Sequence, residues 1–241
     1  MTLLEILRLR YRAWRYRYQL DRAEISFLLG HLRAGESVLD IGAHKGAYAY
    51  WMCRAVGPTG HATCFEPQPE LAAYLRRMKD ALRLNQLTVE NAGVSSGSGE
   101  LTLHVPGSGP SPGSTLEPNL LRNDGQAYRV KVVCLDDYFQ TRPAGKLSLV
   151  KCDVEGHELE VFRGGEKLLK QHRPVLLFEC EERHHPRHTN RDVFAFLVGL
   201  GYDGFFFSRT GLLPLKAFDP ALHGDRASAD YVNNFLFRAT P

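Results

Sequence analysis

Short β-rich segments alternate with helical segments along most of this chain, and that rhythm limits its fold more than any other feature. Strand-like runs occupy residues 37–41, 61–66, 87–94, 147–154 and 174–180, and helical runs occupy residues 47–56, 69–84, 157–171 and 190–200. Such alternation is the signature of parallel β-α units joined by right-handed crossovers. Two closing strand-like runs, 202–208 and 233–238, complete the pattern. We therefore expect an α/β fold with about seven strands, mostly parallel, and helices on both faces of the sheet.

The length of 241 residues suits one domain of this kind. Residues 1–34 predict a helical extension, with one helix over 3–20 and a second from Asp21 to about Leu32, and Gly35 ends it. Residues 35–241 then form the main domain. Its rhythm is interrupted over 97–133, where a loop rich in Ser, Gly and Pro lies between two alternating segments. We expect an antiparallel insertion there, whose Ser114 and Thr115 close over the cleft.

Composition excludes several classes of protein. Apolar residues make up 44% and charged residues 24% of the chain, which is ordinary for a globular protein, and a net charge of +3 is too weak to predict nucleic-acid binding. The five cysteines are scattered singly, as in a reducing compartment. No apolar run approaches the roughly 20 residues that cross a bilayer, and no signal peptide is recognisable. We expect a cytoplasmic protein.

The first helix has an unusual composition. Apolar and aromatic residues recur at steps of three and four, and arginines fill much of the remainder. The recurring residues are Leu3, Leu4, Leu7, Tyr11, Trp14 and Tyr18, and the arginines are Arg8, Arg10, Arg12, Arg15 and Arg17. This pattern is typical of a helix that lies on the inner face of a membrane. It is also typical of a helix that packs on its own domain or on a second subunit of a homodimer, and both alternatives stay open.

A glycine turn follows the first strand, in the segment V-L-D-I-G-A-H-K-G at 38–46. Gly42 permits a tight turn and close approach of a ligand, and Gly46 lets the next helix begin close to the sheet. A dinucleotide site would prefer a second glycine where His44 stands. Asp40, before the first glycine, suits a cationic sulfonium or ammonium group better than a phosphate. We predict that Asp40, Gly42, Ala43, His44 and Gly46 bind the cofactor.

A second cofactor contact is predicted at the end of the next strand. Glu66, in C-F-E-P, follows the glycine turn by about twenty residues, where a carboxylate can accept hydrogen bonds from both ribose hydroxyls of an adenosine. Pro67 lies beside it, and Asn91 with Ala92 ends the third strand, where we expect them to flank the adenine. Enzymes that bind NAD use the same acidic device, so an NAD-dependent oxidoreductase remains an alternative.

Carboxylates also follow the fourth and fifth strands of the main pattern. Asp153 and Glu155 come directly after the fourth strand and Glu179 ends the fifth, at the sheet edge where open α/β folds bind ligands. A carboxylate there could orient a substrate hydroxyl or accept its proton, and Asp153 could also contact the cofactor. His157 starts the next helix, whose dipole lowers the pKa of an imidazole, and we predict it as a base. Alternatively, Glu155 and Glu158 complement that dipole.

No metal site is predicted. The segment E-E-R-H-H-P-R-H offers carboxylates and imidazoles, yet without a diagnostic spacing. We interpret it as a solvated or substrate-facing loop. Its candidate ligands are Glu181, Glu182, His184, His185 and His188.

Several separated motifs together resemble the FkbM family of S-adenosylmethionine-dependent methyltransferases. They are V-L-D-I-G-A-H-K-G at 38–46, C-F-E-P at 64–67, C-L-D-D-Y-F at 134–139, V-K-C-D-V-E-G-H-E-L-E-V-F-R-G at 150–164 and N-N-F-L-F at 233–237. The resemblance implies a Rossmann-like class I methyltransferase fold, S-adenosyl-L-methionine as cofactor, and O-methylation of a sugar, glycolipid, polysaccharide or polyketide-type acceptor.

Two residues depart from the family pattern. The family often has asparagine where His44 stands, and it usually has a smaller or uncharged residue at His157. The role of His157 as a base therefore depends on the dipole argument alone. Besides the oxidoreductase, a non-catalytic module that keeps the fold and docks on a membrane through the first helix is the remaining alternative.

Overall fold

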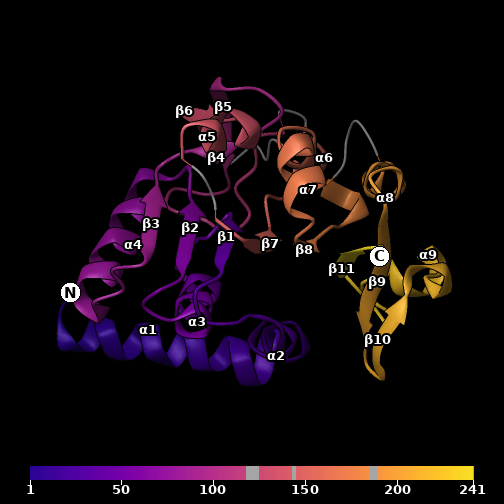
Figure 1. The fold of residues 1–241 in the computed structure, drawn as a ribbon, viewed down its shortest axis with the longest axis horizontal. Helices are drawn as coiled ribbons and strands as arrows, with labels where there is room; N and C mark the ends of the chain where they lie inside the picture. Colours follow the sequence, from indigo (N-terminus) through magenta and orange to yellow (C-terminus); the bar gives the residue numbers. More distant parts are fainter. Residues whose placement is uncertain (118–124, 143–144, 185–188, 241) are drawn as a thin grey trace.

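A single eight-stranded sheet forms the centre of the computed structural model, which describes residues 1–117, 125–142, 145–184 and 189–240 (Figure 1). The order of its strands is β10-β9-β11-β8-β7-β1-β2-β3. The strands are β1 Ser37–Ile41, β2 His61–Phe65, β3 Leu87–Glu90, β7 Leu147–Cys152, β8 Val175–Glu179, β9 Tyr202–Ser208, β10 Gly211–Pro214 and β11 Asn234–Ala239.

The direction of the strands confirms the predicted α/β fold with a mostly parallel sheet. Strands β8, β7, β1, β2 and β3 are parallel to one another, whereas β11 is antiparallel to both β8 and β9. Strand β10, which pairs with β9, is an eighth strand that the sequence pattern did not predict. The chain leaves β1 toward β2 and later returns to the other side of β1 with β7. The carboxyl ends of β1 and β7 therefore flank the topological switch point, where such sheets bind ligands.

Helices cover both faces of the sheet (Figure 1). Because side chains alternate along a strand, Val38 packs with Met52 on one face, while Leu39 and Ile41 pack on the other. The first face is covered by α2 Arg22–His31, α3 Ala47–Val56 and α4 Pro69–Leu82. The second is covered by α5 Leu135–Gln140, α6 Glu158–Arg163, α7 Glu166–His172 and α8 Asn190–Gly199. Shorter helical turns are η3 Glu182–His184, η4 Leu215–Ala217 and α9 Pro220–His223.

The N-terminal helix is present as predicted, and its apolar and aromatic side faces solvent. Helix α1, Leu3–Arg15, continues as a π-helical turn η1, Tyr16–Leu20, and it packs against α3. Leu9 and Ala13 form its buried face, and the Trp51 indole N–H donates to the carbonyl of Ala13 at 2.8 Å. The apolar residues whose spacing predicted the helix lie on its exposed side. The division of the chain at residue 34 stays a prediction.

The insertion forms a second sheet, in the order β4-β6-β5. Strands β5 Gly99–Val105 and β6 Gln126–Val133 pair antiparallel, and β4 Gly93–Val94 joins β6 in parallel. The expectation of one strand over 87–94 is therefore wrong. That segment splits at Asn91 and Ala92 into β3 of the large sheet and β4 of the small one.

The single helix expected over 157–171 is also two helices, α6 and α7, separated by Gly164 and Gly165. A Cβ atom on Gly164 would lie 2.1 Å from the carbonyl oxygen of Ser95, so the chain crosses here too closely for a side chain. The break therefore serves packing between α6 and the end of β4.

All five cysteines are free and buried. In the described part of the chain, no helix combines the length and apolar character that crossing a membrane requires.

Candidate active site

Two hollows meet at the switch point between β1 and β7. The Asp153 N–H donates to the carbonyl of Ile41 at 2.9 Å and so joins the ends of the two strands. Gly42 follows β1 with a φ of +81°, and a Cβ atom there would lie 1.8 Å from the Asp153 carbonyl oxygen. Only glycine fits this position. Gly42, His44, Pro112 and Asp153 line both hollows.

The first hollow lies between the glycine turn, the end of β2 and the insertion. Besides the four shared residues, it is lined by Ile41, Phe65, Glu66, Pro67, Gln68, Gly93, Val94, Leu103, Ser111, Ser114, Leu116 and Val154.

Glu66 is the fixed acid of the first hollow. It is only 2% exposed, one carboxylate oxygen accepts from the His44 N–H at 2.8 Å, and the other accepts from the Gln68 N–H at 2.9 Å. Burial raises the pKa of Glu66 to about 7, although these backbone N–H groups favour its charged form. The carboxylate is thus held in one orientation and can still accept further hydrogen bonds.

His44 turns the chain between the two hollows. Its backbone is left-handed, with a φ of +47°, and burial lowers the pKa of its imidazole to about 4. The ring is therefore neutral at neutral pH. Its Nε2 atom is buried and has no hydrogen-bond partner within the described residues, which leaves it for a ligand.

Other predicted cofactor residues support this wall from behind. Asn91 donates from its amide to the carbonyls of Glu66 at 2.9 Å and Pro67 at 3.0 Å, and Ala92 is buried in the core. Gly93 and Val94, which follow them, line the hollow instead. Gly46 approaches α4 rather than the sheet, because a Cβ atom there would meet Leu75 and Met78.

Gln68 fastens the insertion over the first hollow. Its amide nitrogen donates to the Ser111 carbonyl and to the Ser114 hydroxyl, both at 3.0 Å, and its amide oxygen accepts from the Ser111 N–H at 2.9 Å. Ser114 therefore lies over the hollow, as expected for the cleft. Sequence reasoning missed Gln68, because its partners lie more than forty positions away.

We call the second hollow the acidic hollow. Carboxylates from the ends of β1, β7 and β8 gather there with three basic residues. Besides the shared residues, its lining residues are Arg12, Tyr16, Asp40, Ala43, Lys45, Ala47, Tyr48, Lys151, Glu155 and Glu179.

Lys151 is the buried cation of the acidic hollow. It is 2% exposed, its Nζ lies 3.4 Å from an Asp153 carboxylate oxygen, and it stands 5.0 Å from the centre of the Tyr48 ring. Burial alone would lower the pKa of Lys151, but Asp153, Glu179 and Asp40 together raise it above its ordinary value. Sequence reasoning missed this residue, although a lysine inside the apolar strand L-S-L-V-K-C was a usable signal.

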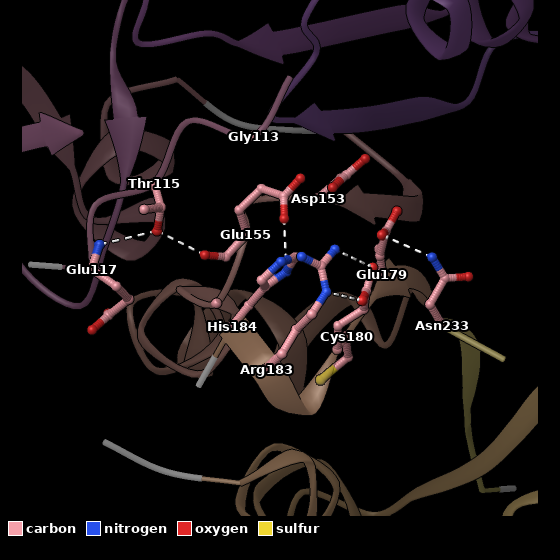
Figure 2. Close-up of polar contacts among 12 residues, drawn as sticks. Gly113, Thr115, Glu117, Asp153, Glu155, Glu179, Cys180, Arg183, His184 and Asn233 are labelled. Atoms are coloured by element: carbon pink, nitrogen blue, oxygen red, sulfur yellow. Dashed lines mark hydrogen bonds and ion pairs between the residues drawn. The ribbon is translucent and has the colours of Figure 1, made fainter. Parts of the chain in front are cut away.

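Two acids of this hollow are kept from full ionisation. Asp40 is 4% exposed, burial raises its pKa to about 7, and its Oδ2 atom has no partner in the part of the chain that the structure describes. Burial and then the charge of Asp153 raise the pKa of Glu179 to about 9. The Asn233 amide donates to Glu179 at 2.8 Å (Figure 2).

Glu155 joins the insertion to the loop after β8. Its φ is +54°, its carbonyl accepts from the Thr115 hydroxyl at 2.7 Å, and its carboxylate lies 2.7 Å from His184 Nδ1 (Figure 2). Gly156 follows with a φ of +99°, and a Cβ atom there would lie 1.8 Å from the His184 carbonyl oxygen. Figure 2 shows Asp153, Glu155 and Glu179 at one edge of the sheet.

His157 does not join these acids. It is buried at the N-cap of α6, with Nε2 2.9 Å from the Ser95 hydroxyl and Nδ1 2.6 Å from the Glu117 carboxylate, and it lines neither hollow. Both ring nitrogens are therefore engaged by protein groups.

The N-terminal helix contributes to the site, which the sequence did not reveal. Arg12 and Tyr16, on the inner side of α1 and η1, line the acidic hollow, and Arg12 Nη1 donates to the Tyr74 hydroxyl at 3.3 Å.

Among the described residues, no group of His, Cys, Asp and Glu could hold a metal ion. His185 and His188 lie outside the described residues.

Comparison with known proteins gives one family and several relatives. The family described as "Methyltransferase FkbM domain" matches residues 40–203. The hexuronic acid methyltransferase AglP of Haloferax volcanii is 27% identical over 152 residues, which cover 63% of this chain and 59% of AglP. A protein-L-isoaspartate O-methyltransferase of Ignicoccus hospitalis is 43% identical over 72 residues, which cover 30% of this chain and 31% of that protein. The chain thus spans less than two thirds of either relative.

Solved structures show the same fold. The methyltransferase FkbM of Methylobacillus flagellatus aligns with a TM-score of 0.53 at 18% identity, over 86% of this chain and 45% of that one. The O-methyltransferase TomG of Streptomyces achromogenes aligns with a TM-score of 0.54 at 16% identity, over 97% and 89% of the two chains. At these identities the likeness concerns the fold.

Proposed function

Because this chain belongs to the FkbM methyltransferase family, we propose that it transfers a methyl group from S-adenosylmethionine to a hydroxyl group of a sugar, glycolipid, polysaccharide or polyketide-type acceptor. Family membership agrees with the resemblance seen in the separated motifs. One observation carries the proposal. The first hollow, which holds the Glu66 carboxylate in one orientation, and the acidic hollow meet at Gly42, where a Cβ atom would not fit. The matching family and both relatives are methyltransferases, so they give the oxidoreductase alternative no support.

The residues of the first hollow fit this methyl donor. We assign Glu66 to the ribose hydroxyls, because its carboxylate is immobilised and retains acceptor capacity. Gly93 and Val94 supply an apolar wall for the adenine. The Oδ2 atom of Asp40, on the side of the acidic hollow, and the Nε2 atom of His44 lack partners among the described residues, and we assign them polar contacts beyond the glycine turn. When bound, S-adenosylmethionine supplies a methyl group on a positively charged sulfur, which is already activated for displacement.

The acidic hollow fits the acceptor. We assign Asp153 and Glu155 to the orientation of the acceptor hydroxyl, because both face this hollow from the ends of β7. Glu179 is the candidate base: its raised pKa makes it a better proton acceptor once it is ionised, and a cation bound nearby favours ionisation. Alignment of two reactants can supply about 7–11 kcal/mol of the barrier, so positioning by these acids matters most.

His157 has a different role in this proposal. Its two ring nitrogens join Ser95 at the end of β4 to Glu117 of the insertion, so we assign it to holding the insertion in place. That assignment replaces the base predicted from the helix dipole.

One relative supports a sugar as the acceptor. The Haloferax relative is a hexuronic acid methyltransferase, and the basic side chains of Arg12 and Lys45 could contact an acidic sugar in the same hollow. Acidic sugars and glycans that carry them are therefore the first acceptors to test. The location of the protein in the cell stays a prediction.

Calorimetry beside a methyl-transfer assay tests the division of roles. Glu66→Gln and Asp40→Asn should weaken binding of S-adenosylhomocysteine at least about tenfold, because each loses a charge-assisted contact. Asp153→Asn and Glu179→Gln should bind it within a few-fold of the parent and lower the rate of transfer of labelled methyl groups about a hundredfold.

Glu70→Gln is the matched control, since Glu70 is an exposed acid in the first turn of α4. It should match the parent in both assays. Unchanged affinity in both Glu66→Gln and Asp40→Asn would defeat the proposed cofactor site, and binding of NADH in place of the methyl donor would favour the oxidoreductase.

A further inference from the structure

The exposed side of α1 and η1 carries a stripe of apolar and aromatic residues that the proposed chemistry does not use. We propose that this stripe docks the protein on the surface of an anionic lipid bilayer. The stripe consists of Leu3, Leu4, Leu7, Tyr11, Trp14 and Tyr18, each exposed, from 45% for Trp14 to 74% for Leu3. The proposal goes beyond methyl transfer and does not depend on it.

The stripe is a separate face from the one that packs on the domain. With 3.6 residues per turn, Leu7, Tyr11 and Trp14 fall on one side of the helix, and Leu9 and Ala13 fall nearly opposite. Leu9 is 2% exposed and Ala13 is 1% exposed. Packing on this domain therefore accounts for the apolar residues of the inner face only. The stripe on the outer face stays exposed to solvent.

The aromatic rings of the stripe form a continuous row. The centres of Tyr11 and Trp14 lie 6.0 Å apart, and those of Trp14 and Tyr18 lie 5.5 Å apart. Trp and Tyr side chains are favoured at the membrane interface, where an apolar ring and a polar group meet both environments. The row therefore has the composition that the headgroup region binds.

Arginines lie on both flanks of the stripe. By helical spacing, Arg8 and Arg15 lie on one side of it and Arg10 on the other, and all three are exposed. None of them forms an ion pair within the residues that the structure describes. Their guanidinium groups remain available for lipid phosphates.

Charge favours a lipid surface over a second copy of the chain. Residues 1–20 contain five arginines and one acid, Glu5, whose carboxylate accepts from the Thr2 N–H at 2.7 Å in the helix cap. If two copies met stripe to stripe, arginine rows would face arginine rows without acids between them. An anionic bilayer supplies the opposite charge along the whole helix.

Docking would place the active site beside the bilayer. The same helix contributes Arg12 and Tyr16 to the wall of the acidic hollow, so a helix diameter of about 10 Å separates that hollow from the stripe. An acceptor held in the membrane could reach the acidic hollow from this side.

Vesicle flotation of the full chain tests the proposal. The parent should float with vesicles of phosphatidylcholine and phosphatidylglycerol in equal parts, and much less with phosphatidylcholine alone or at high salt. Tyr11→Ser with Trp14→Ser should weaken binding to the anionic vesicles at least about tenfold. Arg8→Gln with Arg15→Gln should weaken it about thirtyfold.

Val198→Ser and Arg209→Gln are matched controls, because Val198 is 53% exposed and Arg209 is exposed, both away from α1. Both should bind vesicles like the parent. Circular dichroism and binding of S-adenosylhomocysteine, measured on every variant, separate a lost docking surface from a lost fold or a lost cofactor site.

Two results would overturn the proposal. One is the absence of parent binding to anionic vesicles, or equal binding by the variants of the stripe. The other is a stable dimer in solution that Tyr11→Ser with Trp14→Ser dissociates, since the stripe would then be an interface between two copies.

Discussion

In the first hollow, backbone N–H groups of His44 and Gln68 hold the Glu66 carboxylate, whereas in the acidic hollow the carboxylates of Asp153 and Glu179 share one buried ammonium, that of Lys151. The first arrangement fixes the orientation of the Glu66 carboxylate, because each of its oxygens has its own backbone donor. The second balances charge, because one cation serves several acids. Fixed hydrogen bonds suit recognition of a constant ligand group, and a charge-balanced cluster suits groups whose protonation changes.

The two hollows also differ in what builds them. The glycine turn and the end of β2, which are near one another in the sequence, form one side of the first, and Gln68 fastens the insertion over it. The acidic hollow combines β1, β7, β8 and the N-terminal helix, which are far apart in the sequence. Variants that damage one arrangement and spare the other therefore separate cofactor binding from acceptor chemistry.

Gly42→Ala should damage both hollows and have the largest effect. The new Cβ atom would lie 1.8 Å from the Asp153 carbonyl oxygen, at a φ of +81° that a side chain disfavours. Because the strain of the positive φ and the clash add, we expect the free energy of unfolding to fall by about 4–6 kcal/mol, and binding of S-adenosylhomocysteine to be lost. Denaturant unfolding and calorimetry measure the two effects.

The control for that variant is Gly97→Ala. A Cβ atom on Gly97 would meet open space, and we expect a change in stability within about 0.5 kcal/mol. If Gly42→Ala unfolded at the parent's denaturant concentration and bound the ligand normally, the close contact between the two strand ends would be disproved.

Much of the fold followed from the sequence, because the signals were local. The strand-helix rhythm predicted the five parallel strands and also β9 and β11. It missed β10, since G-L-L-P is too short to show alternation. The same pattern predicted a single helix in place of α6 and α7. The break at Gly164 comes from close contact with Ser95, which lies in a distant part of the sequence.

The candidate site could likewise be predicted only where its signals were local. Gly42 and Glu66, which line the first hollow, were predicted from local spacing, since a turn and a strand end are local features, and their role in cofactor binding stays a prediction. The surroundings of Lys151 and the inner side of α1 were not, because they depend on which strands become neighbours and on how a helix rotates about its axis. For His157, the position at the start of a helix was predicted correctly, but its partners were not. Ser95 and Glu117 lie far from it in the sequence, so no local pattern could predict these contacts.

Lys151→Met should act on the acidic hollow and have the second largest effect. The change leaves Asp153, Asp40 and Glu179 without their buried cation, at an expected loss of about 3–5 kcal/mol in the free energy of unfolding. The loss should be greater at pH 9 than at pH 6, because Asp40 and Glu179, whose pKa values are raised to about 7 and about 9, are more fully ionised there.

Lys131→Met is the matched control, since Lys131 is exposed on β6 and should contribute within about 0.5 kcal/mol. Equal stabilities of the two variants in urea would show that Lys151 does not balance the acids.

Glu66→Gln should sharpen the account of the first hollow through a smaller, pH-dependent effect. Burial raises the pKa of Glu66 from an ordinary 4.5 to about 7, so the folded, ligand-free protein prefers the protonated acid. Its contribution to stability is present below pH 4.5 and is lost as the pH rises through 7. Between pH 5 and 8, the parent should therefore lose about 2 kcal/mol more than Glu66→Gln, which cannot ionise. The exposed-acid variant Glu70→Gln should follow the parent. Parallel curves for Glu66→Gln and the parent would mean that Glu66 is already ionised in the free protein, its buried carboxylate stabilised by the N–H groups of His44 and Gln68 alone.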